Sequence, residues 1–416
     1  MILMNIIGRL RSLSRLARLT LLLHTVFAFT SSIGGVFFNV YLWRTSDSLI
    51  PIAKYQFFYW LTLVLGYILI GYWFKGKGVS RLFRISFLGH FIFYIAVIIL
   101  GEKAGGLVEL LGVMGGFAAS FYWSAHSVMV FSGTEDKLRE IFYGVLGSLG
   151  SFANVVGPAL AGYLIWAGSK FNGKGFAGYY LLFGLLAAVF LLSEFAIRRI
   201  KDVTFEKFSL SGSLRLFKEK PIWRLNLIRS FYDGLMVTRG FLWSVLSFVI
   251  LKNELRLGLA MSAFALLAVL TNPIIGFIYK PVRRLSLNSL GMAFLVLAGI
   301  LYPLLLNPAG LIVDKVLGEA IGWPLFALAW LSFFFLIIEK DEGGKSRQFE
   351  YFTSFEIFQG MGRILSIGLF IAFFDATSQI TFARWWFGAL SLLFIPIWWF
   401  IRKIRVKLVE VGYKEE

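Results

Sequence analysis

Residues 222–250 read IWRLNLIRSFYDGLMVTRGFLWSVLSFVI. The run is long enough to cross the ~30 Å hydrocarbon core of a bilayer as one helix. Arg229, Asp233 and Arg239 interrupt it. A charged side chain near the bilayer centre costs about 2.5–3.5 kcal/mol on insertion scales, so such residues are expected to face a polar cavity or one another. The stretch therefore predicts a membrane-spanning helix that brings charged groups into the interior of a helical bundle.

Apolar runs of similar length recur along the whole chain. Of its 416 residues, 58% are hydrophobic and only 15% are charged, with a mean hydropathy of +0.77. Soluble domains have about a quarter of their residues charged. We therefore expect an all-α integral membrane protein with twelve spans. Their expected bounds are 17–43, 51–74, 82–101, 106–131, 140–166, 178–197, 222–250, 257–279, 286–306, 311–338, 351–374 and 382–401.

The net charge of +18 follows the expected topology. Most basic residues fall in the segments on the same side as the N-terminus, which by the positive-inside rule is the cytoplasm. Both termini are therefore expected in the cytoplasm, with the first span retained rather than cleaved as a signal peptide. A multi-pass protein of the cell membrane (inner or plasma membrane) explains the positive charge without a nucleic-acid partner. We expect a monomer surrounded by lipid bilayer.

Metal and cofactor chemistry is not expected. The chain has no Cys, which excludes disulfides and thiolate ligands. His24, His90 and His126 belong to different spans and have no paired spacing. The sequence thus predicts neither a metal site nor a cofactor.

The spans divide into two similar halves. Residues 198–221 form a basic linker between residues 1–197 and 222–416. GYWFK (71–75) follows the second span and GFIYK (276–280) follows the eighth. The segments KLREIFY (137–143) and KSRQFEY (345–351) open the fifth and eleventh spans. Two six-helix bundles repeated in the same orientation predict a site between them near the midplane.

The fifth span carries GSLGSFANVVGPALAG (147–162). Twelve spans in a 6+6 repeat and this Gly-Pro motif resemble the major facilitator superfamily of secondary transporters. Ala153 and Ala161 stand where the motif prefers Gly, and Lys75 replaces the Asp of the superfamily's loop signature. The resemblance implies alternating access, contact between spans five and eight across the halves, and functional loops on the inner face. The inner-face residues are Gly71, Lys75, Arg81, Gly276 and Lys280.

Small residues follow one face of the fifth span. Helices in lipid approach closely where such residues meet, so this stripe predicts a sliding surface between the bundles, with TNPIIG (271–276) as its partner. Ordinary tight packing is the alternative. The residues of the stripe are Gly147, Ser151, Asn154, Gly157, Pro158 and Gly162.

Charged residues in three spans are candidates for the transport site. Asp233 lies about 17 Å into its helix at 1.5 Å per residue, near the midplane. Arg229, one turn earlier, can pair with it, whereas Arg239 points to another side and needs either a different partner or the cavity. In the eleventh span Glu356, Gln359 and Arg363 share one stripe, and Arg363 is level with Asp233. Further candidates are Glu319, which Lys315 can neutralise, and the cavity-facing Tyr122, Trp123 and His126 of the fourth span.

Two interpretations of these charges remain open: ion pairs that fix helix register, or a cavity in which Arg residues hold an anionic group and Asp233 carries a proton. The leading function is a secondary active transporter that moves a small solute, anionic or amphipathic in character, together with a proton. The alternative is a flippase or exporter of an amphipathic or lipid-linked anion. No P-loop is present and the external loops lack a catalytic cluster, so an enzyme is not expected.

Overall fold

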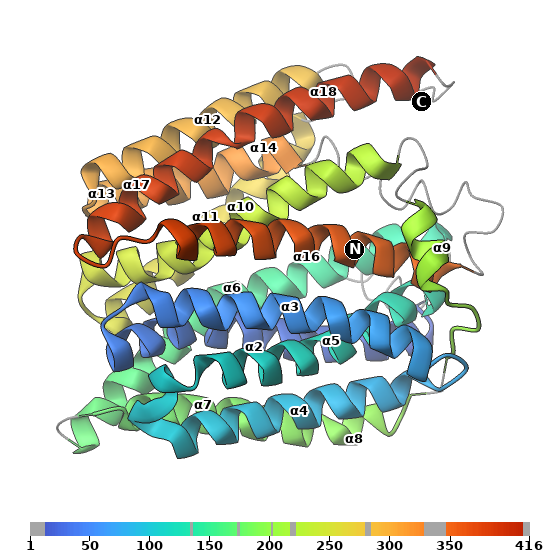
Figure 1. Ribbon diagram of the computed structural model, residues 1–416, viewed down its shortest axis with the longest axis horizontal. Helices are drawn as coiled ribbons and strands as arrows, with labels where there is room; N and C mark the ends of the chain where they lie inside the picture. Colours follow the sequence, from blue (N-terminus) through green and yellow to red (C-terminus); the bar gives the residue numbers. More distant parts are fainter. Residues whose placement is uncertain are drawn as a thin grey trace, which may run out of the picture.

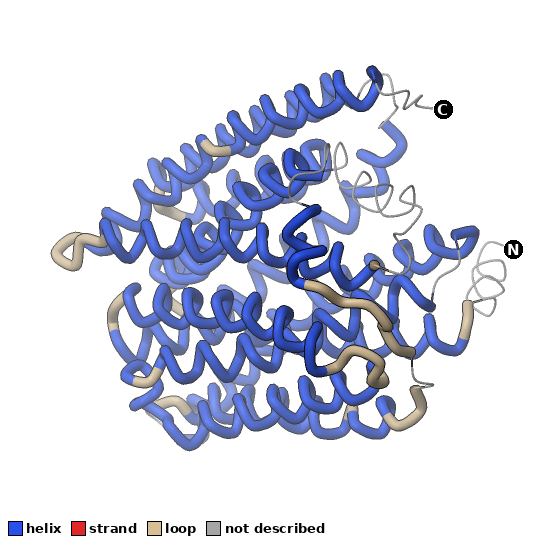
Figure 2. Tube along the Cα trace, turned by 45° about the vertical axis from the view of Figure 1, so that its right-hand side comes forward, coloured by secondary structure: helices blue, strands red, loops and turns tan. Residues whose placement is uncertain are grey.

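The computed structural model describes residues 13–133, 136–172, 175–200, 203–216, 222–278, 284–327 and 347–410. The regular structure of these residues is helical, and none of them forms a strand (Figure 2).

The helices of the first half are α2 (Arg15–Ser46), α3 (Leu49–Trp73), α4 (Val79–Leu100), η1 (Gly101–Gly106), α5 (Val108–Gly133), α6 (Asp136–Asn172), α7 (Ala177–Leu192) and α8 (Glu194–Ile197). The short helix α9 (Leu210–Arg215) lies in the linker. The second half contains α10 (Ile222–Leu251), α11 (Glu254–Ile278), α12 (Arg284–Leu305), α13 (Pro308–Val313), η4 (Asp314–Gly322), α14 (Trp323–Ala327), α16 (Gln348–Phe373), α17 (Gln379–Leu392) and α18 (Phe394–Glu410).

Ten helices of the described part are long and apolar enough to cross a membrane, so this is a multi-pass α-helical membrane protein. They coincide with ten of the predicted spans. The span predicted at 106–131 corresponds to α5, whose apolar residues are diluted by Gly, Ser, Trp and His. The span predicted at 311–338 is divided into shorter helices, and residues 328–338 lie outside the described residues.

The long helices lie side by side along one direction (Figure 1). At the end where α2 begins and α18 ends, which we call the terminal end, the linker helix α9 is also found. The opposite end, which we call the far end, carries the turn between α2 and α3. There Asp47 ends α2 in a left-handed conformation, with φ of 47°, and the Ser48 hydroxyl caps α3 by accepting from the backbone N–H of Ile50. A two-residue turn thus reverses the chain and makes α2 and α3 antiparallel neighbours.

The main helix pairs that join the first half of the chain to the second are α3 with α16, α6 with α11, and α2 with α10. α2 and α10 hold equivalent positions in the two halves, and the other two pairs are equivalent to each other, because α3 corresponds to α11 and α6 corresponds to α16. The interface between the halves is therefore built symmetrically from matching helices.

The two halves are tied together at the far end. Arg44 of α2 forms a 2.6 Å ion pair with Glu254 of α11, and the Tyr179 hydroxyl donates to the same carboxylate at 3.1 Å. The Gln379 amide donates to the Asp47 carbonyl at 2.9 Å. These contacts close the far end between α2, α7, α11 and α17.

The α6–α11 contact lies near the far end, and not at the TNPIIG segment predicted as its partner. A Cβ at Gly258 would lie 2.2 Å from the Pro158 carbonyl oxygen, and one at Gly162 would lie 2.6 Å from the Glu254 carbonyl oxygen. In addition, the Ala159 N–H donates to the Ser262 hydroxyl at 3.0 Å. Small residues on both helices therefore allow direct backbone contact at this end, as they do in other membrane proteins.

Other members of the predicted stripe do not pack across the halves. A Cβ added at Gly147 would have no neighbouring atom within 4 Å, so the prediction of helix packing there is wrong. Gly157 packs on Ser32 of α2 within the first half. Ser151 and Asn154 line a cavity instead. The close backbone contacts of α6 with α11 are at Pro158 and Gly162, and sequence spacing does not reveal which part of a stripe is approached.

The loop between α3 and α4 is bound by the linker at the terminal end. The backbone N–H groups of Gly76 and Val79 donate to carbonyls of residues 205 and 203, both at 2.9 Å. Gly71 is required there because a Cβ would lie 2.5 Å from the Phe208 ring. Lys75 and Arg81 are exposed beside this loop. Of the matching residues in the second half, Gly276 lies in α11, whereas Lys280 lies outside the described residues.

A nine-residue π-helix, η4, interrupts the region predicted as one continuous span. Such helices are rare and are found frequently at functional sites. The Thr271 hydroxyl of α11 donates to the Ala320 carbonyl of η4 at 2.9 Å, which gives one backbone acceptor of this irregular helix a partner. Pro324, just after η4, has no N–H to pair with that carbonyl, and this signal was not used in predicting one continuous span.

Candidate functional site

Two cavities lie between the halves of the chain. The larger, with a volume of about 540 Å³, is bounded by α2, α3 and α6 from the first half and by α10, α11 and η4 from the second. Its polar lining comes from hydroxyl and amide side chains on both sides. They include Ser31, Asn39, Gln56, Asn154, Ser244 and Asn272. We call it the central cavity.

A chain of side-chain amides crosses the central cavity from one half to the other. The Gln56 amide donates to the Asn39 carbonyl oxygen at 3.3 Å, and the Asn39 amide donates to the Ser244 hydroxyl at 3.4 Å. Both distances exceed the usual 2.9–3.0 Å for such bonds. These groups are therefore partnered only weakly with each other and can bond to a solute.

One ion pair borders the central cavity. Glu319 accepts from Lys315 one helical turn before it, as the sequence spacing predicted. The Lys315 ammonium also lies 3.8 Å from the centre of the Trp243 ring. The Glu319 side chain is 59% exposed, whereas that of Lys315 is 14% exposed. The carboxylate is thus the more accessible partner.

The second cavity, of about 310 Å³, lies nearer the terminal end between α3, α5, α10 and α16. Arg229, Glu356, Gln359 and Arg363 line it on the side of the second half. The first half contributes mainly aromatic and aliphatic side chains. Trp60 lines both cavities and so marks the boundary between them.

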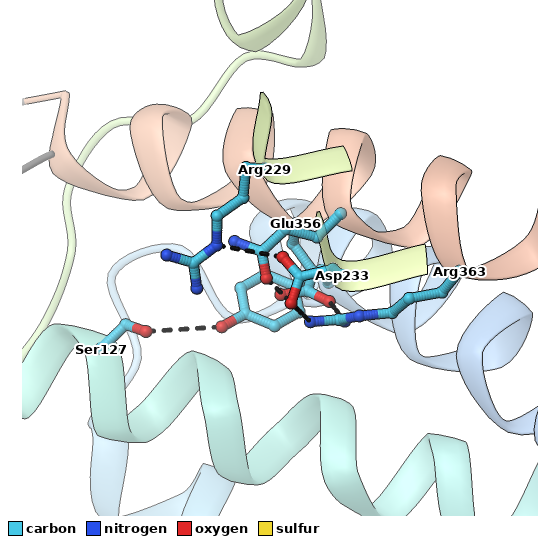
Figure 3. Close-up of polar contacts among 7 residues, drawn as sticks. Ser127, Arg229, Asp233, Glu356 and Arg363 are labelled. Carbon is cyan, nitrogen blue, oxygen red and sulfur yellow. Dashed lines mark hydrogen bonds and ion pairs between the residues drawn. The ribbon is translucent and has the colours of Figure 1, made fainter. Parts of the chain in front are cut away.

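The predicted charges of α10 and α16 form one connected cluster (Figure 3). Arg229 donates to Asp233 at 3.0 Å, which confirms the pair expected from their spacing. Arg363 lies 2.7 Å from Glu356 and 3.4 Å from Asp233, so the expected link between the two helices is also present. The Gln359 amide oxygen accepts from Arg363 at 2.8 Å. This cluster contains two guanidinium groups and two carboxylates.

The charge cluster also reaches the first half of the chain. The Arg363 guanidinium lies 4.1 Å from the centre of the Trp60 ring of α3. Such cation–π contacts are strongest where water is excluded. The indole Nε1 of Trp60 is buried without a hydrogen-bond partner in the structure. Arg363 therefore connects α16 with both α10 and α3.

Arg239 belongs to a separate pair inside the second half. It donates to Asp314 of η4 at 3.1 Å, and its guanidinium lies 4.3 Å from the centre of the Phe387 ring. Both charged side chains are nearly buried, with 11% and 7% of their surface exposed. Neither residue lines the two cavities. Arg239 thus stabilises packing around η4, and sequence reasoning missed Asp314 as its partner.

The aromatic candidates of α5 do not all face a cavity. Trp123 and His126 line the second cavity. Tyr122 is fully buried, with its ring stacked 3.5 Å from that of Phe27, so its prediction as a cavity-facing residue is wrong. Its hydroxyl is 2.9 Å from His24 Nδ1. Tyr122 therefore orients a neighbouring histidine and has no direct access to a solute.

Two histidines expected to be separate are adjacent. The ring centres of His24 and His126 are 4.6 Å apart, because α2 and α5 lie side by side at this depth. His90 packs elsewhere, against Phe190 of α7. Within the described ranges, no group of three or more His, Asp or Glu side chains is arranged to hold a metal ion.

Solved structures of transporters share this architecture over nearly its whole length. A bacterial homologue of the iron transporter ferroportin, in an inward-facing state, matches with a TM-score of 0.65 and 14% identity, over 92% of this chain and 98% of that one. The chain has the fold of the major facilitator superfamily. The Escherichia coli fucose:proton symporter has a TM-score of 0.61 at 14% identity (93% and 98% covered), and the human organic anion transporter MFSD10 has 0.58 at 13% (93% and 99%).

Curated relatives exist at higher sequence identity. The Bacillus subtilis protein YqgE, described as uncharacterized, is 28% identical over 90% of this chain and 86% of its own length. An uncharacterized protein encoded in the sodM 3′ region of Geobacillus stearothermophilus is 30% identical over 37% of this chain and 72% of its own length. This chain therefore belongs to one family with the Geobacillus protein. No protein-family model matches it.

Proposed function

We propose that this protein is a secondary active transporter that moves a small solute by alternating access. The observation that carries the proposal is the central cavity, which has a polar lining and is shared between the two halves of the chain. Solute binding between two units that rock against each other is the working principle of such carriers. The fold shared with known transporters supports this proposal.

The proposed units are residues 1–197 and 222–416, joined by the linker 198–221. We place the terminal end in the cytoplasm, on the basis of its basic residues, and the protein in the cell membrane as a monomer. The Arg44–Glu254 ion pair joins the halves at the far end, whereas a Cβ added at Gly144 or Gly147 of α6 would meet no atom within 4 Å. This combination supports an inward-facing arrangement.

We further propose that the charge cluster couples solute movement to a proton. Asp233 and Glu356 share Arg363, so protonation of either carboxylate removes one of the two anions that hold its guanidinium. Arg363 also contacts Trp60 of the opposite half. A change in protonation would therefore alter a contact across the interface. It would shift the balance between the inward-facing and outward-facing states only if this contact is stronger in one state than in the other.

A carrier of amphipathic or lipid-linked anions is the second candidate. It is favoured by the second cavity, whose lining combines the aromatic rings of Trp123, Phe131 and Phe352 with the guanidinium groups of Arg229 and Arg363. Such a cavity could hold a hydrocarbon chain beside an anionic head group. Export of a fluorescent phospholipid analogue from proteoliposomes would distinguish it from a carrier of small solutes.

Alternating access can be tested without knowing the solute. The chain has no Cys, so Ser31→Cys places a single thiol in the central cavity. In vesicles of known orientation, an impermeant thiol reagent should label this residue from either side, because the two states interconvert. Asp375→Cys, in the exposed far-end loop, is the control and should be labelled from one side only. Labelling of Ser31→Cys from one side under all conditions would contradict the proposal.

A further inference from the structure

The charged side chains around the central cavity balance each other. Within the described residues, its charged lining consists of Lys315 and Glu319, and these two form an ion pair with each other. Their net charge is zero. An ionic solute would find no unpaired opposite charge here.

The second cavity is balanced in the same way. Arg229 and Arg363 contribute two positive charges, and Asp233 and Glu356 contribute two negative charges. Every one of these four groups contacts at least one group of opposite sign. An anion bound beside Arg229 and Arg363 would give this balanced site a net negative charge, and repulsion from Asp233 and Glu356 would oppose its binding.

The remaining lining favours hydrogen bonding with neutral groups. Gln56, Asn39 and Ser244 form a chain across the central cavity through bonds of 3.3 and 3.4 Å. Amide and hydroxyl groups both donate and accept, so they match solute hydroxyls or amides. Moving a charged group out of water costs far more than moving such a polar group that finds its hydrogen-bond partners.

We infer that the solute of this carrier has no net charge and is held by hydroxyl- and amide-type hydrogen bonds from Gln56, Asn39 and Ser244. This inference rests on the proposed transport function and deepens it. Two kinds of molecule share the required chemistry: a polyol, and a zwitterion whose two charges could contact Lys315 and Glu319. An anion, as expected from the sequence, does not fit this balance.

The charge of the cavity can be measured with thiol reagents. In purified Ser31→Cys protein in detergent micelles, we compare methanethiosulfonates of similar size that carry a neutral hydroxyethyl, an anionic sulfonatoethyl or a cationic trimethylammonium-ethyl group. Each labelling rate is divided by that of a free thiol in solution. The neutral reagent should react about tenfold faster than either charged one, because an electrically balanced cavity does not compensate the cost of an entering charge. An anionic rate equal to or above the neutral rate would overturn the inference.

A matched pair of variants calibrates this assay. Glu319→Gln leaves Lys315 without its partner and should raise the anionic rate selectively. Glu109→Gln makes the same chemical change at a carboxylate that pairs with Lys54 away from the cavities, and should change no rate. If the anionic reagent reacts as fast before the Glu319 change as after it, the cavity is electropositive from the start and the inference fails.

Protection separates the two kinds of solute. Myo-inositol represents polyols, glycine betaine represents zwitterions, and gluconate is the anionic comparison. Slowing of Ser31→Cys labelling by one of the first two supports the inference and identifies the class, whereas protection by gluconate alone overturns it. Micelles expose both sides of the protein, so these results do not depend on alternating access, which the labelling of oriented vesicles tests separately.

Discussion

Arg363 contacts side chains on three helices of the interface. Its guanidinium meets Glu356 and Gln359 on its own helix, Asp233 on α10 and the Trp60 ring on α3. A planar guanidinium can serve several acceptors and stack on a ring at the same time, which a Lys ammonium cannot do. The position thus requires Arg, and its partners determine when it can move.

Removal of the Asp233 charge should uncouple the carrier from pH. In oriented vesicles, the ratio of inside to outside labelling of Ser31→Cys should differ between pH 5.5 and 7.5, because protonation of the cluster shifts the balance of states. Asp233→Asn should abolish most of this difference, since the cluster then loses one of its two carboxylates. Glu109→Gln, remote from the cluster, should keep it. A full pH response in Asp233→Asn would assign the proton to another group.

The Arg239–Asp314 pair should behave as a structural unit. Asp314→Leu leaves Arg239 buried without its partner and should cost about 3–5 kcal/mol of unfolding free energy. Replacing both residues, Arg239→Met with Asp314→Leu, should recover most of this loss because neither charge remains. Thermal melting of purified protein measures both effects. If the double variant is no more stable than Asp314→Leu alone, the pair does not act as a unit.

Sequence spacing predicted contacts within a helix better than contacts between helices. Arg229 with Asp233, and Lys315 with Glu319, follow from the 3.6-residue period, since residues four apart share a face. The partner of Arg239 lies 75 residues away on an irregular helix, and its choice depends on the rotation and depth of both helices. The adjacency of His24 and His126 was missed for the same reason.

At the scale of elements, the predicted stripe on α6 was correct in face but not in extent. Gly162 meets the backbone of α11, whereas Gly147 on the same helix faces open space. A pattern of small residues predicts which face of a helix another helix can pack against closely. The crossing angle and position of the two helices determine which part of that face is in contact. The stripe therefore serves packing at the far end and the cavity wall in the middle.

Two Gly→Ala variants should separate these roles. Gly258→Ala should destabilise the protein by about 1–3 kcal/mol, because the new methyl group would lie 2.2 Å from the Pro158 carbonyl oxygen and would push the helices apart. Gly147→Ala has room for its methyl group and should be neutral or slightly stabilising, since Ala favours helix by up to about 1 kcal/mol. Melting temperatures test both. Equal losses would show that the α6–α11 contact is not specific to the far end.

The loop between α16 and α17 should be sensitive only to strong acid. Hydrogen bonds from Ser378 and Thr377 lower the pKa of Asp375 to about 2 from its usual 3.8. A lowered pKa stabilises the folded protein above pH 4, and this contribution is lost as the pH falls from about 4 to 2. Asp375→Asn should therefore melt below wild type at pH 6, with the gap closing towards pH 2. A gap that does not change with pH would rule out the carboxylate charge as its cause.

At the scale of the whole molecule, composition alone was sufficient for the membrane class. The length and number of apolar runs leave few alternatives to a helical bundle, and the faint repeat indicated matching halves. Neither property contains the division of the span at 311–338, because the length of an apolar run does not reveal the hydrogen-bonding pattern of its backbone. The sequence also could not show which end of the bundle is closed. That depends on contacts such as Arg44 with Glu254, which join residues 210 positions apart.

Closure of the far end should control access to the central cavity. Ala159 and Ser262 are in contact there across the two halves, through a 3.0 Å hydrogen bond from backbone N–H to hydroxyl. Ala159→Cys with Ser262→Cys should therefore form a disulfide under mild oxidation and hold the protein in the state described here. Ser31→Cys is added to this double variant, and a reversible thiol cap protects part of it during oxidation. After the cap is removed, Ser31→Cys should be labelled from the terminal side only.

Reduction of the disulfide should restore labelling from both sides, because the halves can again separate at the far end. The matched control places the two cysteines at Gly147 and Asn272 of the same helices. A Cβ at Gly147 would meet no atom within 4 Å, so no rapid cross-link should form there. Continued labelling from the far side after complete cross-linking would mean that solutes reach the cavity without movement of α6 against α11. Rocking of the two halves would then have to be replaced by a local gate.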